Sequence, residues 1–226
     1  YISKCRFIIE RISKGNSLKL KIGGCYIALS LITFCYLYGW GLEILINSFT
    51  YIPGKINLLL LAFPLSSTLA TKSLINSVHN IINPITIDCS RNNLELAKYE
   101  LSQIVGRDVK DMSKDEIIRA TAESASENSV DGIFAPLFWI FIGSLMWKYS
   151  TSLPGPLAYG FAFKGISTLD SMLGYKKNSL KWMGAFSAKI DDLAVFVPCR
   201  CVALSLPLIC RSWRKVPAII YKSFQE

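Results

Sequence analysis

GGCYIALSLITFCYLYGWGL, residues 23–42, is a run of twenty residues without a charge. A helix rises about 1.5 Å per residue, so twenty residues reach about 30 Å, the thickness of a bilayer's hydrocarbon core. We therefore predict a transmembrane helix over this stretch. Shorter uncharged runs follow at 56–71, 132–147, 149–163 and 201–210. Together the runs predict an all-α, multi-pass integral membrane protein with about four to five apolar helices and a polar, amphipathic helical segment between them.

The composition excludes several classes of protein. Of the 226 residues, 51% are hydrophobic and 18% are charged, with a mean hydropathy of +0.36. These values exclude a disordered chain, a collagen and a coiled coil. The seven cysteines form no C-x-x-C motif and His79 is the only histidine, which excludes a zinc site of the usual spacing. We expect the cysteines to be reduced thiols.

Positive charge gathers at the two ends of the sequence. Residues 1–22 carry six Lys or Arg against Glu10 alone, and residues 211–226 carry four against Glu226. Nucleic-acid binders more often spread their cations along one face or groove, so we expect no nucleic-acid partner. Cytoplasmic segments of membrane proteins are enriched in Lys and Arg. We therefore predict a multi-pass protein of the cell membrane, in contact with membrane lipid, with both basic termini in the cytoplasm.

Negative charge gathers in the middle of the sequence, where residues 88–131 hold ten of the sixteen acids. This contrast divides the chain into a basic amino-terminal arm (1–22), transmembrane helices (23–87), a polar helical segment (88–131) and further transmembrane helices with polar loops (132–226). We expect these parts to form one membrane domain.

Two helices are predicted within the polar segment. The first begins near Asn92 and ends at Gly106, because glycine favours the end of a helix. The second begins after Ser113, because Ser113 and Glu116 have the spacing of a capping box, in which each side chain bonds the backbone N–H of the other residue.

Charged residues recur at four-residue steps on the second of these helices: Arg119, Glu123, Glu127 and Asp131. They share one face if the helix continues as far as Asp131. One interpretation is a solvated face with an ion pair between Arg119 and Glu123. The other is a functional carboxylate cluster, because acids close to a bilayer are usually paired, hydrated or bound to a cation. Mg²⁺ suits such a cluster because it prefers oxygen ligands.

Two more polar stretches lie at 167–177 and 187–200. The Gly174–Lys177 segment offers donors suited to a phosphate, and a basic loop beside a membrane would have the same composition. Asp191 and Asp192 suit either a metal ion or a helix cap. The sequence has no Walker A, G-x-G-x-x-G, G-x-S-x-G or H-E-x-x-H motif, which excludes the usual nucleotide-loop, dinucleotide-binding, serine-hydrolase and zincin classes.

Three ordered blocks resemble the CbiB/CobD family of adenosylcobinamide-phosphate synthases in cobalamin biosynthesis. The blocks are IVGRDVKDMSKDEIIRATAESASENSVDGIFAPLFW (104–139), STLDSMLGYKK (167–177) and FSAKIDDLAVFVPCR (186–200). The specific resemblance covers about residues 94–211, while residues 1–90 match only as a basic arm and apolar spans. The family's amino-terminal His-Pro segment and its carboxyl-terminal S-P-N and G-G-x-x-x-Y-F-G region have no counterpart here, so we expect the sequence to be truncated at both ends.

Within the matching blocks, the sequence departs from the family pattern at a few positions. Ser167 stands where the family has Asn, Lys189 where it has Arg, Val195 where it has Asn, and Cys199 where it has Ala. Lys keeps the charge of Arg but loses its two-pronged hydrogen bonding, and Val195 removes an amide. We expect some substrate contacts to differ.

The resemblance implies a membrane enzyme that joins adenosylcobyric acid, a corrinoid, to (R)-1-aminopropan-2-ol phosphate or aminopropanol. This ATP-dependent amide ligation gives adenosylcobinamide phosphate. A carboxylate must first be activated, which we expect to occur as an acyl phosphate, with Mg²⁺ and cations stabilising the phosphoryl transfer. ATP and Mg²⁺ are therefore the expected cofactors, and we expect association with other cobalamin-assembly enzymes.

We assign roles to matching or nearby residues as hypotheses. The catalytic set is Glu123, Glu127, Asn128, Asp131 and Asp170, with Glu123 as general base for the attacking amine. The substrate and phosphate contacts are Arg107, Lys164, Tyr175, Lys176 and Arg200. The Mg²⁺ ligands are Glu127, Asp131, Asp170, Asp191 and Asp192.

Two alternatives from other classes stay open. Intramembrane acids and broken apolar segments also mark an ion-coupled membrane transporter, which would need no ATP. A catalytically impaired corrinoid-binding membrane subunit would explain Val195 and Lys189, and restoring the family residues should then recover activity.

Overall fold

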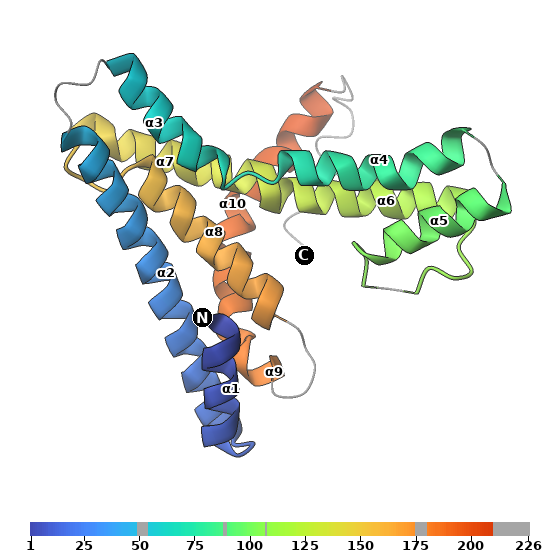
Figure 1. The fold of residues 1–226 in the computed structure, drawn as a ribbon, viewed down its shortest axis with the longest axis horizontal. Coiled ribbons are helices and arrows are strands. Elements are labelled where there is room, and N and C mark those ends of the chain that lie inside the picture. Colours follow the sequence, from blue (N-terminus) through green and yellow to red (C-terminus); the bar gives the residue numbers. More distant parts are fainter. Residues whose placement is uncertain (49–53, 88–89, 107, 175–179, 210–226) are drawn as a thin grey trace. The chain divides into compact units, whose positions relative to one another are not determined.

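The computed structural model describes residues 1–48, 54–87, 90–106, 108–174 and 180–209 (Figure 1). Every regular element in these ranges is a helix, which confirms the predicted all-α class. In chain order the elements are α1 (Ile2–Ser13), α2 (Ser17–Ser48), α3 (Gly54–Ser66), α4 (Thr71–Ile87), α5 (Arg91–Ser102), α6 (Lys114–Ser129), the π-helix η1 (Val130–Phe134), α7 (Ala135–Tyr149), α8 (Pro156–Leu173), α9 (Leu180–Met183) and α10 (Ala185–Ile209).

Two helical runs in the described ranges are long and apolar enough to cross a membrane, Ser17–Ser48 and Lys114–Tyr149. The first contains the predicted span at residues 23–42. A third span results if Lys55–Ser66 and Thr71–Ile87, which are bent by 44° at the break between them, count as one. The predicted number of four to five apolar helices is therefore not confirmed.

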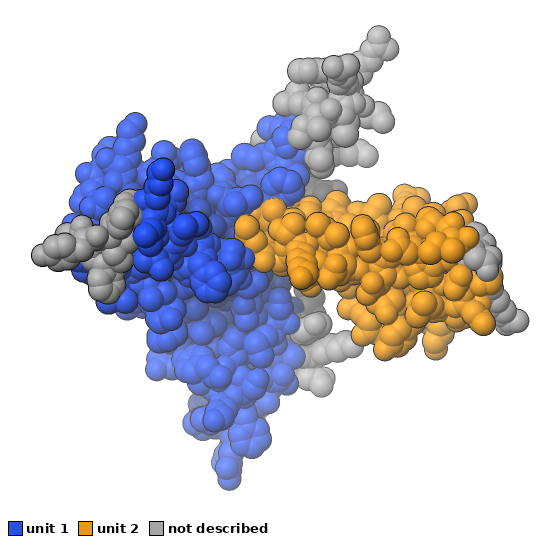
Figure 2. Space-filling view, turned by 45° about the horizontal axis from the view of Figure 1, so that its top comes forward, with its two compact units in different colours: residues 1–68, 134–226 blue, residues 69–133 orange. Residues whose placement is uncertain are grey.

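The chain divides into two compact units, residues 1–68 with 134–226 and residues 69–133 (Figure 2). In the larger unit, α2 lies along α8. A Cβ atom at Gly39 would stand 2.5 Å from the carbonyl oxygen of Leu157, so only glycine permits this approach. Ile27, Leu169 and Met183 are fully buried in the core cluster that joins these helices to α9. The small residues of α2 thus allow the close backbone packing that is typical of membrane helices.

The smaller unit packs α4, α5 and α6 around one core. Its fully buried members include Ile81, Leu101 and Ile117. The predicted capping box is confirmed at the start of α6. The Glu116 N–H donates to the Ser113 hydroxyl at 3.4 Å, and the Ser113 N–H donates to the Glu116 carboxylate at 2.7 Å. The first turn of α6 is therefore held by the two side chains that the sequence indicated.

The prediction that the preceding helix ends at Gly106 is wrong, because α5 ends at Ser102. The backbone tightens there, since the Gln103 N–H donates to the Glu100 carbonyl and the Ile104 N–H donates to the Leu101 carbonyl, each three residues back. The chain then turns so that Ile104 and Val105 pack against the core of this unit. Tertiary packing therefore ends the helix before the glycine.

Candidate functional site

Glu123 and Glu127 line the same hollow in the smaller unit. The hollow has a volume of about 280 Å³. Its other lining residues come from the turn before Arg107 and from the same face of α6: Ile104, Val105, Gly106, Ala120 and Ser124. Both carboxylates are on the exposed surface of α6. The predicted four-residue spacing therefore places two acids beside the turn that opens the first family-like block.

Hydrogen bonds within the unit hold this turn against α6. The Ser124 hydroxyl donates to the Ile104 carbonyl at 3.3 Å. The Asn128 amide donates to the Ser124 carbonyl at 2.8 Å and to its hydroxyl at 3.2 Å. The lining residues of the hollow do not include Asn128. In this arrangement Asn128 positions Ser124, and its predicted catalytic role stays a prediction.

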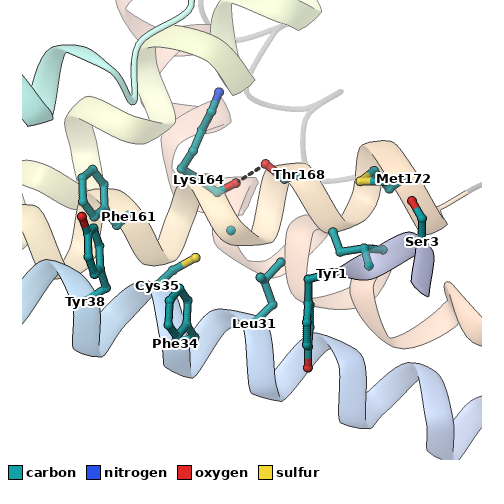
Figure 3. Close-up of a pocket in the computed structure, with 12 residues that line it drawn as sticks. Tyr1, Ser3, Leu31, Phe34, Cys35, Tyr38, Phe161, Lys164, Thr168 and Met172 are labelled. Atoms are coloured by element: carbon teal, nitrogen blue, oxygen red, sulfur yellow. Dashed lines mark hydrogen bonds between the residues drawn. The ribbon is translucent and has the colours of Figure 1, made fainter. Parts of the chain in front are cut away.

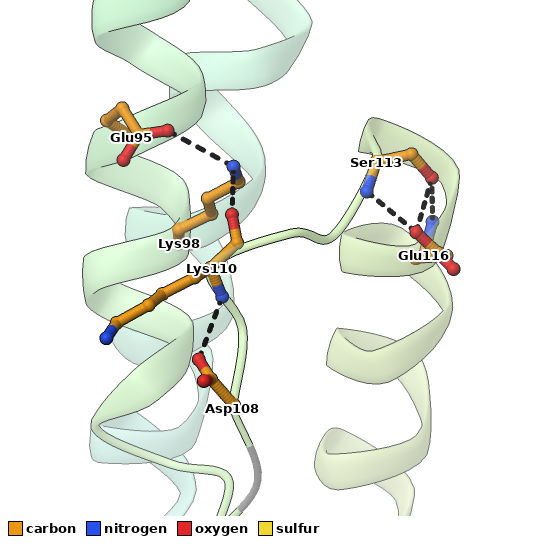
Figure 4. A network of polar contacts seen from close by, with 6 residues as sticks. All are labelled: Glu95, Lys98, Asp108, Lys110, Ser113 and Glu116. Atoms are coloured by element: carbon orange, nitrogen blue, oxygen red, sulfur yellow. Dashed lines mark hydrogen bonds and ion pairs between the residues drawn. The ribbon is translucent and has the colours of Figure 1, made fainter.

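The loop that leads away from the hollow is fastened to α5 (Figure 4). The Lys98 ammonium donates to the Lys110 carbonyl at 2.6 Å and pairs with Glu95 at 3.1 Å. The Asp108 carboxylate accepts from the Lys110 N–H at 3.1 Å. Arg107 itself lies outside the described residues. The Asp108–Lys110 and Lys98–Lys110 bonds therefore fasten the described chain after Arg107 to α5.

The regular helix does not continue to Asp131 as the shared face required. Residues Val130–Phe134 form a π-helical turn, in which Asp131 lies. The Gly132 carbonyl accepts a hydrogen bond from the Ala70 N–H at 2.9 Å, which comes from outside the helix. A π-helical turn changes the rotation per residue, so the four-residue repeat is interrupted. Asp131 accordingly is not among the residues that line the hollow.

A second pair of acids lies in the larger unit, on α8 and α10. Asp170 is half-buried and Asp192 is exposed. Burial raises the pKa of the Asp170 carboxyl above its ordinary value, and the nearby charge of Asp192 raises it further. Helix α8 is not among the candidate spans. Like charges disfavour each other's ionised form, which is the direction of this shift, and the predicted role of the two acids in metal binding stays a prediction.

The remaining predicted contacts of the larger unit are spread over α8 and α10. Lys164 is exposed, and Figure 3 shows its side chain pointing away from the aromatic residues of α2. The Thr168 hydroxyl donates to the Lys164 carbonyl at 2.7 Å. The Arg200 guanidinium donates to the Phe196 carbonyl at 3.0 Å and lies over the Phe196 ring. Tyr175 and Lys176 lie outside the described residues.

The five predicted Mg²⁺ ligands are divided between the two units. Glu127 and Asp131 belong to the smaller unit, and Asp170, Asp191 and Asp192 belong to the larger. Among the described residues, no group of three or more His, Cys, Asp or Glu side chains is close enough to hold a metal. Mg²⁺ commonly uses one or two protein carboxylates and completes its shell with water and phosphate oxygens. A site in either unit would therefore need only some of the five predicted ligands, and the full ligand set stays a prediction.

Glu43 is the structurally important acid that the sequence reasoning missed. It is the only acid in α2 and is 1% exposed. Its carboxylate accepts hydrogen bonds from the backbone N–H groups of Gly155 at 2.7 Å, Leu157 at 2.5 Å and Ala158 at 3.3 Å. These groups have no partner within α8 because they lie at its amino end. A lone acid just after a twenty-residue uncharged run was the available signal.

The family model described as "CobD/Cbib protein" matches residues 1–222. The chain belongs to the CobD/CbiB family. The match extends well beyond residues 94–211, so the first ninety residues carry more family signal than a basic arm and apolar spans.

Curated CobD/CbiB relatives align over much of the chain. A "Cobalamin biosynthesis protein CobD" of Synechocystis is 30% identical over 215 residues, which cover 95% of this chain and 59% of the relative. One of Clostridium acetobutylicum is 35% identical over 92% of this chain and 61% of its own length. The "Cobalamin biosynthesis protein CbiB" of Salmonella typhimurium is 38% identical over 66% of this chain and 43% of its own length.

The chain thus spans about three fifths of the length of the CobD relatives from Synechocystis and Clostridium acetobutylicum. No solved structure matches it. The relatives' names describe those proteins, and the geometry above describes the part of the family that this chain contains.

Proposed function

We propose that this chain acts in cobalamin biosynthesis and contributes to the ATP-dependent amide ligation that forms adenosylcobinamide phosphate. The observation that carries the proposal is the hollow shared by Glu123, Glu127 and the turn at Ile104–Gly106. These residues lie in the first family-like block, and family membership supports the pathway. The reaction needs acids beside a phosphate-contacting cation, and Arg107 directly follows the turn.

The reaction makes two chemical demands. A carboxylate oxygen of adenosylcobyric acid attacks the terminal phosphorus of ATP, and ADP leaves as an acyl phosphate forms. The amine of aminopropanol phosphate then attacks the acyl carbon, and phosphate leaves as the amide forms. The first step concentrates negative charge, and the second releases a proton from the amine.

The residues of this chain suit both demands. Glu127 would hold Mg²⁺, which neutralises phosphate charge when bound. Glu123 lies one turn away on the same hollow and would take the proton from the amine. Arg107 would contact phosphate oxygens beside these acids, and Lys164 and Arg200 stay predicted phosphate contacts of the larger unit. Asp170 and Asp192, in the larger unit, would provide a second place for a cation.

The test is product formation by membranes that contain the protein, measured by mass spectrometry. The substrates are adenosylcobyric acid, aminopropanol phosphate and ATP with Mg²⁺. We expect product that requires ATP and falls at least a hundredfold in Glu127→Gln. The matched control is Asp115→Asn, because Asp115 is an exposed acid on the same helix and does not line the hollow.

The possible results distinguish the ligase activity, the role of Glu127 and the transporter alternative. Product that survives in Glu127→Gln keeps the ligase and removes Glu127 from its essential residues. Equal loss in Asp115→Asn would mean that charge on α6, and not the hollow, is what matters. Uptake of a corrinoid without ATP, in place of product, would favour the transporter alternative.

A further inference from the structure

The amino-terminal residues form a helical hairpin that packs onto the larger unit. Helix α1 folds back along the start of α2 through Lys14 and Gly15, which both have positive φ. The Ile9 side chain lies against Gly23, and the Tyr1 hydroxyl is 2.7 Å from that of Ser30. Residues 1–22, with α2 as far as Ser30, are called the basic hairpin below. It is an integral part of the fold and not a loose arm.

The outer surface of the basic hairpin combines cations with large apolar side chains. Its exposed cations are Lys4, Arg11, Lys14, Lys19 and Lys21. Its apolar residues with more than half of their surface exposed are Tyr1, Phe7, Ile8, Ile12, Leu18, Ile22 and Tyr26. The only acid, Glu10, pairs with Arg6 at 3.0 Å. A helical surface that is both basic and apolar is typical of segments that lie at an anionic membrane surface.

The length of α2 places this surface at the edge of the bilayer. Its 32 residues span about 48 Å at 1.5 Å per residue, whereas the hydrocarbon core is about 30 Å thick. A typical tilt of about 20° shortens the vertical reach by only about 3 Å. About ten residues therefore extend beyond the core. The segment with Lys19 and Lys21 is the charged end of α2, and α1 lies beside it.

A tryptophan lies beside the charged end of α2 in the larger unit. Trp182, on α9, is 38% exposed. The Lys21 ammonium lies 4.8 Å from the centre of its ring and the Lys181 ammonium 5.5 Å. Tryptophan is enriched where membrane meets water, and its ring attracts cations. The contacts of Trp182 with Lys21 and Lys181 therefore connect the basic hairpin to α9 and extend its positively charged surface.

We propose that the basic hairpin is a binding surface for the headgroups of anionic phospholipids. The cations pair with lipid phosphates, while Phe7, Ile12 and Leu18 enter the layer between headgroups and acyl chains. A nucleic acid or soluble anion would account for the cations alone. The apolar side chains between these cations, and the continuity of the hairpin with the α2 span, favour a lipid over either of these ligands.

The test measures lipid retention by the purified full chain with native mass spectrometry. Protein in detergent is mixed with phosphatidylglycerol or phosphatidylcholine of identical acyl chains. The variant neutralises four exposed cations by Lys4→Gln, Arg11→Gln, Lys14→Gln and Lys19→Gln. The control neutralises four exposed cations elsewhere, by Lys55→Gln, Lys72→Gln, Lys110→Gln and Lys148→Gln. A second variant keeps the charge by Lys4→Arg, Lys14→Arg and Lys19→Arg.

We expect wild type to prefer phosphatidylglycerol and the neutralised variant to lose that preference by well over tenfold, because each cation near a lipid surface contributes about fivefold. The control and the Arg variant should retain it, and added salt should weaken it in both. A neutralised variant that keeps the full preference overturns the proposal. So does equal loss in the control, or displacement of the lipid by duplex DNA at equal phosphate concentration.

Discussion

The hollow in the smaller unit is built from residues close in sequence, whereas two important hydrogen-bonded contacts of the larger unit join residues far apart in sequence. In residues 69–133, the hollow is built from residues 104–127, and Ser124 bonds Ile104 only twenty positions away. In the larger unit, Glu43 caps a helix that begins more than a hundred residues later, and the Trp139 indole donates to the Ala194 carbonyl at 3.0 Å. Sequence patterns alone therefore predict that Glu123 and Glu127 lie together. The contacts of Glu43 and Trp139 can be found only from the tertiary structure.

The largest loss of stability is expected when a contact between residues far apart in sequence is removed. Glu43→Ala leaves three backbone N–H groups of α8 without their acceptor. We expect a loss of about 3–5 kcal/mol in the free energy of unfolding, since each unsatisfied buried group costs about 1–3 kcal/mol. The measurement is denaturant unfolding of the purified protein in detergent.

Glu43→Gln is the matched variant, because its amide oxygen still accepts a hydrogen bond. It should lose clearly less stability than Glu43→Ala. Equal stability of wild type and Glu43→Ala would show that the amino end of α8 does not depend on this carboxylate.

The next effect concerns Val195, where the family pattern has Asn. Val195 packs against the cluster of Ala135, Phe163 and Ala194. Val195→Asn brings a polar amide to this apolar contact, so we expect a loss of about 1–3 kcal/mol in unfolding free energy and no gain of product. Val195→Ala controls for lost volume. A rise in product formation would instead support the impaired-subunit alternative.

A smaller effect is expected within the local site. Ser124→Ala removes the hydroxyl that donates to Ile104 and accepts from Asn128. We expect a loss of about 1 kcal/mol, with faster hydrogen exchange confined to the turn at 104–106 and the adjoining turn of α6. Ser126→Ala is the control, because that exposed hydroxyl bonds only within its own helix. Identical exchange in both variants would mean that Ser124 does not fasten the turn.

The smallest effect tests the acid pair on α8 and α10. The pKa of Asp170 is raised in the folded protein, so the folded state holds a proton at pH values where the unfolded state has released it. Stability should therefore fall as pH rises from the ordinary Asp range through the raised value. Thermal unfolding between about pH 4 and 7 should show this slope in wild type and a flatter one in Asp170→Asn. An unchanged slope would remove Asp170 as its source.

The sequence alone determined the features that depend on neighbouring residues. The uncharged run at 23–42 predicted a membrane-spanning helix, because the length of an apolar run can be read from neighbouring residues alone. The Ser113–Glu116 spacing gave the start of α6, and the repeat gave the shared position of Glu123 and Glu127, because helical geometry fixes which residues share a face.

Only the tertiary structure decided the features that depend on distant partners. Packing of Ile104 and Val105 ends α5 early, and the π-helical turn at Val130–Phe134 removes Asp131 from the acidic face. Glu43 looks like an isolated charge in an apolar helix until α8 supplies its partners. The periodicity of a sequence describes the geometry of a single helix. The end of α5, the position of Asp131 and the partners of Glu43 depend instead on which groups of other segments pack against that helix.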